Sequence, residues 1–372
     1  MLSLAQGAYT SQQVRDILHA RTGSREVRFR YALLNKYDVE IGTLSSVMEG
    51  SVSQDSLAEI TRTARFEMAE NEALDINWLT DRIKPYMQIR MPDGAWIEWP
   101  LGVFLISSPS RYDGAGSVTR SIEAYDKNLI LQEDCFTNRY LIAAGTTYTD
   151  AITTIIETAG IWKHNITSST AALEVAKEFE IGTTKLSAVN ELLTELNYSP
   201  LYVDANGYTV GAPYVIPTLR ETDYSYETDE VSIIEPGATH EEDLFGVPNL
   251  WVVTATNPEK SALVSTYTNI RATSPTSTIN RGRTIVDYRL ISDVFDQTTL
   301  DAYVLRLAYE ASQIYGRFIF NTALMPHHGH NDMLFINHDG LSVDTKYTEI
   351  SWDMELKSGG TMRHECRRVI KI

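Results

Sequence analysis

Apolar residues recur at every second position in the first third of the chain, which is the period of a half-buried β-strand. Residues 27–33 alternate Val, Phe, Tyr and Leu with Arg, Arg and Ala, and similar runs follow with short connections. About six such runs predict an antiparallel β-barrel or sandwich over residues 25–130. We expect Phe66, Met68 and Phe104 to lie in its interior.

The period changes in the middle of the chain to that of amphipathic helices. Two stretches carry apolar residues at helical spacing: Ile152, Ile155, Ile156 and Ala159 in the first, and Leu186, Val189, Leu193 and Leu196 in the second. A hairpin signal follows at residues 201–210, because Asn206 and Gly207 favour a tight primed turn. Together these patterns predict a small α+β module.

The last third is again rich in strand patterns and includes one amphipathic helix over residues 300–314. Residues 347–357 form the most regular strand pattern of the chain. We expect its apolar face to point into a second barrel through Trp352, Met354 and Leu356. On the opposite face, away from that core, we expect three acids: Glu349, Asp353 and Glu355.

The two β-rich regions end alike, with a strand, a glycine-rich polar turn and another strand. The turns lie at residues 113–116 and 358–360. This echo fits a duplicated domain, although two antiparallel hairpins can also look alike by chance. Duplication matters for assembly, because three chains with two similar barrels each would place six similar units around one axis.

These patterns predict a mixed α+β, β-rich fold, with two antiparallel β-barrel domains and an inserted small α+β module. We expect four segments: 1–135, 136–215, 216–246 and 247–372. The third is an acidic connecting segment, since residues 221–243 hold nine acids and no Lys or Arg. It is either a solvated connection or a functional acidic surface.

The formal net charge is -17, from 32 Lys and Arg against 49 Asp and Glu. Sequence-independent binding to nucleic acid depends on Lys and Arg side chains that neutralise phosphates. Tight binding of DNA or RNA is therefore excluded, although passing contact is not.

Two distant cysteines indicate no disulfide framework. No signal peptide is visible, and no apolar run approaches the roughly 20 residues of a membrane span. We expect a protein folded in a cytoplasm, without a membrane anchor.

The densest polar cluster holds three histidines and an aspartate within six residues: His327, His328, His330 and Asp332. These are ligand types for zinc or iron. A closed metal site normally draws ligands from separated segments, however, and His338 and His364 stand alone in the sequence. We therefore expect an exposed loop without a metal, and a bound metal is the alternative.

Other chemistry has little support in the sequence. Trp96 and Trp99 beside Tyr86 could line a sugar groove, but aromatic residues on half-buried strands usually belong to the core. Carboxylate pairs for glycoside hydrolysis converge only in three dimensions, so 49 acids single out no candidate. No nucleophile elbow, phosphate loop or dinucleotide fingerprint occurs. The sequence predicts no catalytic, cofactor-binding or metal-binding residue.

Several strings in the first 130 residues resemble the tail-tip hub proteins of long-tailed bacteriophages, which are similar to the baseplate hub and late-control protein D family of contractile tails. They are VRFRYALL at 27–34, GSV at 50–52, ITRTA at 60–64, DRIKP at 81–85, WPLGVFLISSP at 99–109 and SIEAYD at 121–126. The resemblance continues diffusely through the α+β module and the second β region.

This resemblance implies a structural protein rather than an enzyme: a homotrimeric ring that closes the tail tube, with two tube-type barrel domains per chain and no cofactor. The implied partners are a distal tail ring protein, the tape measure protein and fibre or spike proteins, with DNA only as passing cargo. The implied location is the virion tail, assembled in the host cytoplasm. Such proteins often carry a wall peptidase or a spike after the hub. This chain stops after the second hairpin, so we expect that activity to be absent or separately encoded.

Two other classes compete with the hub. A cell-wall-degrading or carbohydrate-binding tail protein should show a deep pocket with convergent carboxylates of perturbed pKa. A receptor-binding module should show an exposed aromatic patch at a loop-rich tip. A hub should show flat, self-complementary faces.

The implied passage of DNA also predicts the sign of the charge on the wall of the channel. A conduit lined with Lys and Arg would hold DNA, whereas carboxylates repel phosphate at short range. We therefore expect part of the negative charge to face the axis, although the sequence does not say whether the Glu349 face is lumen or exterior. The alternative is that the acids keep the outer surface soluble.

Overall fold

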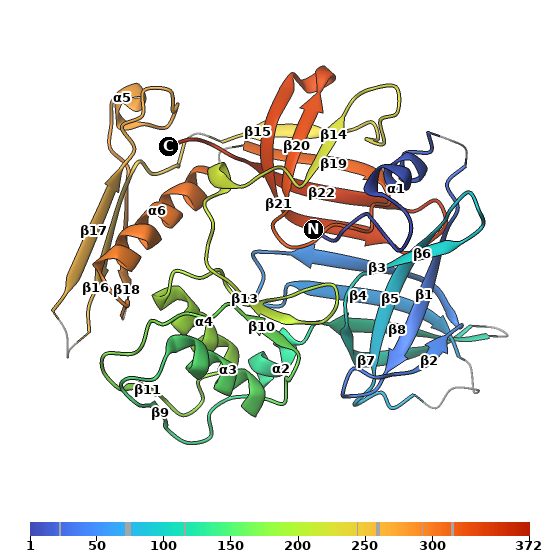
Figure 1. Cartoon of the computed structure of the whole chain (residues 1–372), viewed down its shortest axis with the longest axis horizontal. Helices are drawn as coiled ribbons and strands as arrows, with labels where there is room; N and C mark the ends of the chain where they lie inside the picture. The colour runs from blue at the N-terminus through green and yellow to red at the C-terminus, as the bar shows by residue number, and fades with distance from the viewer. Residues whose placement is uncertain are drawn as a thin grey trace.

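The computed structural model describes residues 1–21, 24–70, 76–114, 117–243, 245–257, 261–291, 293–313 and 316–372. It is a mixed α+β protein in which strands predominate (Figure 1). The first region holds one helix and eight strands: α1 (Ser11–Leu18), β1 (Val27–Leu34), β2 (Glu40–Leu44), β3 (Val47–Asp55), β4 (Arg62–Ala69), β5 (Arg82–Arg90), β6 (Trp96–Pro100), β7 (Phe104–Gly114) and β8 (Ser117–Tyr125). The turn expected at residues 113–116 lies partly outside the described residues, at Ala115 and Gly116.

The middle of the chain forms the expected α+β module around its own apolar core. Its elements are α2 (Asn128–Glu133), β9 (Tyr140–Ile142), α3 (Tyr148–Thr158), β10 (His164–Ile166), β11 (Lys177–Phe179), α4 (Lys185–Glu195), β12 (Tyr202–Val203), β13 (Thr209–Gly211) and η1 (Pro217–Leu219). The hairpin prediction is confirmed, because β12 pairs antiparallel with β13. Its turn needs glycine at Gly207, which has φ +79° and leaves only 2.7 Å between an added Cβ and a methyl group of Val103.

The rest of the chain returns to strands. Its elements are β14 (Tyr224–Glu227), β15 (Thr239–Glu242), β16 (Leu250–Ala255), β17 (Leu263–Thr268), α5 (Thr278–Arg281), β18 (Val286–Ile291), α6 (Gln297–Gln313), β19 (Gly316–Ala323), β20 (Met333–His338), η2 (Asp339–Leu341), β21 (Val343–Glu355) and β22 (Thr361–Arg368). The amphipathic helix is confirmed as α6, and Ile314 lies outside the described residues. Among the described helices, none has the length and apolar character needed to cross a membrane.

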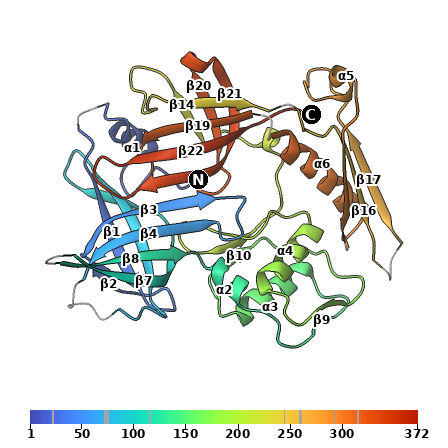
Figure 2. The ribbon, with the colours of Figure 1, turned by 180° about the vertical axis from the view of Figure 1, so that it is seen from behind.

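One 14-stranded sheet joins the two ends of the chain. Its strand order is β15-β19-β22-β21-β3-β4-β8-β7-β5-β1-β2. Off this path, β20 pairs with β21, β14 pairs with β20, and β6 pairs with β5. The join is the antiparallel pair β21–β3, in which Ser351 lies opposite Asp55 and Glu355 opposite Ser51. Both views show the red strands of the last region beside the blue strands of the first (Figures 1 and 2).

The β-rich character of the fold is confirmed, but no closed barrel is seen in the part of the chain that the structure describes. The main sheet is an open path of strands. At the join, the backbone N–H and C=O groups on the free edge of β3 form hydrogen bonds with those on the facing edge of β21. Neither region closes on its own edge. The two β-rich regions therefore behave as halves of one sheet.

The predicted interior positions are confirmed. Phe66, Met68 and Phe104 are at most 3% exposed, and Trp352, Met354 and Leu356 are each 1% exposed. All six side chains belong to one apolar cluster that spans both halves of the main sheet. The join is thus supported by a shared core as well as by backbone hydrogen bonds.

The prediction that Glu349 points away from the core is wrong. Tyr347, Thr348, Glu349 and Ile350 are buried in succession, so the alternation of the sequence breaks there. The cause is a β-bulge between Glu349 and Ser351 in the pairing of β21 with β22, which turns the strand.

Asp353 and Glu355, beyond the bulge, keep 49% and 46% of their side-chain surface exposed. Each has a cation beside it, Arg363 at 3.6 Å and Lys357 at 3.3 Å. Their negative charge is therefore largely balanced by neighbours on the same hairpin.

The acidic segment 216–246 is partly built into the sheet. Strand β14 pairs in parallel with β20, and β15 pairs antiparallel with β19. Strands β16, β17 and β18 form a separate sheet that α6 covers on one side (Figure 1). The segment boundaries stay predictions.

Arg62 ties the module to the main sheet from a fully buried position. Its guanidinium donates to the carbonyl oxygens of Val203 (3.2 Å) and Leu101 (3.0 Å), and its carbon Cζ lies 5.2 Å from the ring centre of Trp352. Asp126 accepts from the Arg62 backbone N–H at 2.7 Å. One side chain therefore contacts the first region, the module and the last region.

We expect Arg62→Ala to lower the free energy of unfolding by about 3–5 kcal/mol, because it leaves two buried carbonyls without donors and opens a cavity. Arg65→Ala is the matched control on the same strand, since that side chain is 76% exposed and should cost about 0.5 kcal/mol or less. Urea unfolding of both variants measures the difference. Equal losses would contradict the assigned role of Arg62.

Candidate functional site

The histidine-rich loop between β19 and β20 folds into the protein. The expectation of an exposed loop is wrong, since His327, His328 and Asp332 are at most 2% exposed. The loop is held by its backbone, with the Gly329 N–H donating to Asp332 (2.5 Å) and the Trp352 indole donating to the Gly329 carbonyl (3.0 Å). These bonds satisfy polar groups that burial would otherwise leave unpaired.

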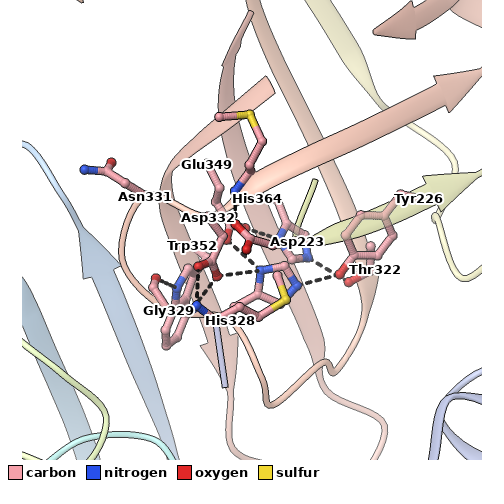
Figure 3. A network of polar contacts seen from close by, with 12 residues as sticks. Asp223, Tyr226, Thr322, His328, Gly329, Asn331, Asp332, Glu349, Trp352 and His364 are labelled. Atoms are coloured by element: carbon pink, nitrogen blue, oxygen red, sulfur yellow. Dashed lines mark hydrogen bonds and ion pairs between the residues drawn. The ribbon is translucent and has the colours of Figure 1, made fainter. Parts of the chain in front are cut away.

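The loop brings His328 to two residues that are distant in sequence, Glu349 on β21 and His364 on β22 (Figure 3). His328 Nδ1 lies 2.6 Å from Glu349 Oε2, and His364 Nδ1 lies 2.6 Å from Glu349 Oε1. All three side chains are completely buried. One carboxylate thus accepts a hydrogen bond from each of two imidazoles.

The outer nitrogens of both rings have hydroxyl partners. His328 Nε2 lies 2.7 Å from the Tyr226 hydroxyl, and His364 Nε2 lies 2.8 Å from Thr322 Oγ1. The His364 ring also stacks on Phe320, with ring centres 4.7 Å apart. Each ring nitrogen in the cluster therefore has a hydrogen-bond partner.

Electrostatics make Glu349 the charged member. Burial alone would raise the pKa of Glu349, but the hydrogen bonds and charge of the two histidines outweigh burial and hold that pKa at about 2. Burial lowers the pKa of His364, and the hydrogen bond that His364 donates to Glu349 opposes that shift only in part. The cluster is therefore a buried carboxylate held by imidazole N–H groups.

The cluster has the composition of a two-histidine, one-carboxylate metal site, with its ligand atoms within 4.8 Å of one another. Its geometry fits hydrogen bonds better. Ligands on one tetrahedral zinc lie roughly 3.3 Å apart, given metal–ligand distances near 2.0 Å. The two nitrogen–oxygen separations of 2.6 Å are shorter than that and suit a shared proton. That the chain holds no metal stays a prediction.

His327 and His330 lie outside the cluster. Both ring nitrogens of His327 are buried without a hydrogen-bond partner among the described residues, and burial lowers its pKa well below the usual value. His330 stacks on Tyr202 with ring centres 4.0 Å apart, and burial lowers its pKa to about 3. Both histidines are therefore neutral. His327 is a packing residue, whereas the ring nitrogens of His330 lie 3.2 Å from Gln54 Nε2 and 3.1 Å from Asn331 Nδ2.

The proposed sugar groove is not formed by the aromatic residues named for it. Trp99 is completely buried and donates its indole N–H to the Ser3 carbonyl. The guanidinium carbon of Arg28 lies 3.9 Å from the ring centre of Trp96, and that of Arg30 lies 4.1 Å from the ring centre of Tyr86. The core interpretation holds for Trp99, and the other two rings pack under arginines.

Among the residues that the structure describes, two carboxyl groups have raised pKa values, and both have structural partners. Burial raises the pKa of Asp126 to about 6, and Asp126 accepts hydrogen bonds from Thr61, Arg62 and Asn128. Burial raises the pKa of Glu195 to about 7, although Lys177 contacts it at 2.5 Å. Neither residue lines the cavity described next.

A cavity of about 670 Å³ lies where the first region, the α+β module and the last region meet. Its wall carries four arginines: Arg220, Arg289, Arg306 and Arg367. The carboxylates in its wall are Glu59 and Glu310, and Arg306 donates to Glu310 at 2.7 Å. Arginines therefore outnumber carboxylates in the cavity wall, and one of its two carboxylates is already engaged by an arginine.

No family model and no curated protein matches the sequence. The 43 kDa tail protein of prophage MuSo2 from Shewanella oneidensis is 10% identical with a TM-score of 0.64, and the match covers 91% of this chain and 98% of that one. A prophage tail protein from Listeria monocytogenes EGD-e is 12% identical with a TM-score of 0.55, covering 91% and 94%. The chain has the fold of prophage tail proteins.

Two further structures extend this likeness. The tail protein of Neisseria meningitidis MC58 is 12% identical with a TM-score of 0.63, over 92% of this chain and 97% of that one. A chain of the Francisella PdpA–VgrG complex is 8% identical with a TM-score of 0.54, over 93% of this chain and 53% of that one. At such identities only the fold is shared, and function has to be argued from the molecule.

Sequence reasoning found His328 but missed its partners. Glu349 was placed on the wrong face because a bulge cannot be read from alternation. His364 was dismissed as isolated, although it falls between Met362 and Cys366 at an inward-facing position of a strand. A polar residue on an apolar strand face was the signal that a buried partner exists.

We expect His327→Leu to leave stability unchanged or to raise it by about 1 kcal/mol, because it removes two buried, unpaired ring nitrogens. His328→Leu is the neighbouring control and should cost about 2–4 kcal/mol, since it removes one of the two imidazole partners of the buried Glu349 carboxylate and the partner of the Tyr226 hydroxyl. Thermal and urea unfolding measure both variants. An equal effect of the two substitutions would contradict the hydrogen-bond assignment.

The advantage of His327→Leu should grow on acidification. His327 stays neutral in the folded protein, but in the unfolded chain it takes up a proton near pH 6.5. The free energy of unfolding is therefore unaffected by this group above pH 6.5 and falls as the pH drops below that value. The slope is about 1.4 kcal/mol per pH unit. Asp126 and Glu195 change the free energy of unfolding with pH in the opposite direction, but they do so equally in the variant and the parent. The two proteins are therefore compared with each other at each pH from 7 to 5. A constant difference across this range would count against a neutral His327.

Proposed function

We propose that this chain is the structural hub of a phage tail tip or baseplate, where three copies form a ring that closes the tail tube. The observation that supports it most is the join between β21 and β3, which makes one sheet from the first and last regions of the chain. The fold is shared with prophage tail proteins over more than nine tenths of the chain.

The proposal includes two tube-type domains, at residues 1–135 and 247–372, with the module of 136–215 and the segment 216–246 between them. Three such chains would place six β-rich units around one axis. The pairing of β3 with β21 supports this, because it sets one unit beside the next by strand pairing within a single chain. Superposition of residues 25–130 on 247–372 as related β-barrels is part of the proposal.

The proposed partners are the distal tail ring protein on one side and fibre or spike proteins on the other, with the tape measure protein and DNA passing through. The proposed location is the virion tail, with assembly in the host cytoplasm. We also propose that part of the net charge of -17 faces the axis. Glu349 is buried and cannot contribute, so that charge would come from other acids.

A structural rather than enzymatic role is the proposal that the site supports best. The buried carboxyl groups with shifted pKa values hold structural hydrogen bonds, and in the cavity wall four arginines stand against two glutamates. We expect no cell-wall-degrading or carbohydrate-binding activity. Zymography on cell walls with a known muralytic enzyme as control, together with metal analysis of the pure protein, tests this, and a cleared zone or one equivalent of zinc or iron would overturn it.

Electron microscopy of the assembled particle tests the hub itself. We expect three copies of the 41.8 kDa chain, about 125 kDa, in a ring at the distal end of the tail tube. Labelling with an antibody against the chain gives its position. A location elsewhere on the particle, or a symmetry other than threefold at the tip, would overturn the assignment.

A further inference from the structure

The cavity of about 670 Å³ has one cation in its wall that lacks a partner. Three of its four arginines each contact a carboxylate: Arg306 with Glu310 at 2.7 Å, Arg289 with Asp287 at 3.1 Å and Arg220 with Asp223 at 3.3 Å. The fourth, Arg367, forms no hydrogen bond or ion pair with any residue that the structure describes. The wall therefore holds one guanidinium whose charge is not balanced by a direct contact.

The surroundings of Arg367 make this lack of a partner costly. Arg367 lies on β22 directly opposite Thr348 of β21, on a face of the sheet that is partly closed off from solvent. Burial lowers the pKa of Arg367, and the attraction of Glu365, Asp55 and Glu310 opposes that shift only in part. A guanidinium that has lost water without gaining an acceptor favours the binding of an anion.

Two other arginines of the wall are fixed in position and keep donors to spare. Besides their carboxylates, Arg306 donates to the Tyr198 carbonyl at 2.6 Å and Arg220 donates to the Asn331 carbonyl at 2.6 Å. A guanidinium has five N–H donors, so two bonds each leave further donors in both side chains. Because these side chains are already held, an anion that binds between them pays little to order them.

The rest of the wall is largely apolar. Leu57 and Val215 are 61% and 53% exposed at the cavity, and Pro200, Pro213 and Ile350 line it as well. An apolar lining with a few convergent polar groups is typical of small-molecule sites, whose volumes are roughly 300–1,000 Å³. The cavity thus combines a place for a negative group with a surface for an apolar body.

The acids of the wall leave that place open. Glu310 is engaged by Arg306, and Glu59 accepts a hydrogen bond from Gln132 at 3.3 Å. The chain as a whole carries a net charge of -17, so a cavity in which arginines outnumber acids departs from the rest of the molecule.

We propose that this cavity binds a small organic anion, with its carboxylate or phosphate group on Arg367 and its apolar body against the proline-rich wall. Carboxylate and phosphate oxygens match the planar fork of a guanidinium, which can donate two parallel hydrogen bonds to either group. One unbalanced cation calls for one such group. This inference does not depend on the proposed place of the chain in a phage tail.

Four probes test the proposal on the full-length parent chain. Phenyl phosphate and benzoate present the two anionic groups on the same ring, benzamide is the uncharged isostere of benzoate, and inorganic phosphate has no apolar body. We expect phenyl phosphate or benzoate to bind and to raise the midpoint of thermal unfolding, and the tighter of the two identifies the preferred group. Inorganic phosphate should bind more weakly, and benzamide should bind about tenfold more weakly than benzoate or not at all. Calorimetric titration gives the dissociation constants.

A variant locates the site. Arg367→Gln should weaken binding of the tighter anion about tenfold or more, because it removes a charged hydrogen-bond donor. Arg368→Gln is the matched control, since it makes the same charge change at the next residue of β22. The Arg368 side chain pairs with Glu242 at 3.0 Å and lies outside the cavity wall, so this control should bind as the parent does. Circular dichroism and unfolding without ligand show that both variants are folded.

Three results would overturn the proposal. They are a parent chain that binds neither phenyl phosphate nor benzoate, equal binding of benzamide and benzoate, and an equal loss of affinity in Arg367→Gln and Arg368→Gln. The first two need no variant, so they decide the matter even if Arg367→Gln fails to fold. Microscopy of the particle tests the hub separately, and neither result bears on the other.

Discussion

Backbone pairing between β21 and β3 is the interaction on which the rest of this structure depends. An unpaired strand edge exposes donors and acceptors that must find water or another strand. Here the edge of the first region and the edge of the last region satisfy each other, so residues about 300 positions apart share one sheet and one apolar core. The long sequence between them is then free to form the α+β module and the β16–β18 sheet as attachments to a fixed body. Arg62 reaches across this boundary to the module, which couples the position of the attachment to the sheet.

The buried histidine–glutamate cluster follows from that arrangement. The bulge in β21 turns Glu349 into the core, where its side chain is completely buried from solvent. An isolated carboxylate there would cost several kcal/mol, so the fold needs donors at fixed positions on both sides of it. His364 on β22 and His328 on the β19–β20 loop provide them, and Tyr226 on β14 binds the far side of the His328 ring. The cluster therefore links three strands and one loop, which makes the loop a part of the core rather than a surface feature.

Most of the local structure could be predicted from the sequence, and most of the assembly of elements could not. The strand around Trp352, the α3 and α4 helices and the β12–β13 hairpin follow from periodicity and turn residues, which are local signals. The pairing of β21 with β3 depends on two edges meeting and leaves no local trace. The same holds for the bulge that moved Glu349, and for the contact of His364 with a loop 36 residues earlier. The cluster was missed because each of its members, taken alone, looks like an ordinary surface or core residue.

The weak identity to prophage tail proteins has a physical explanation in this sheet. Backbone hydrogen bonds between edge strands do not depend on side chains, so strand order can persist while nearly nine residues in ten differ from those of a protein with the same fold. Side chains that differ between such proteins cannot define the common body, but they can decide which surfaces attract or repel. In this chain the net charge is -17, yet the strand register of β16–β18 sets only apolar residues and threonines on the face of that small sheet that points away from α6. The shared sheet fixes where such surfaces point, and the side chains on them differ from one protein with this fold to the next.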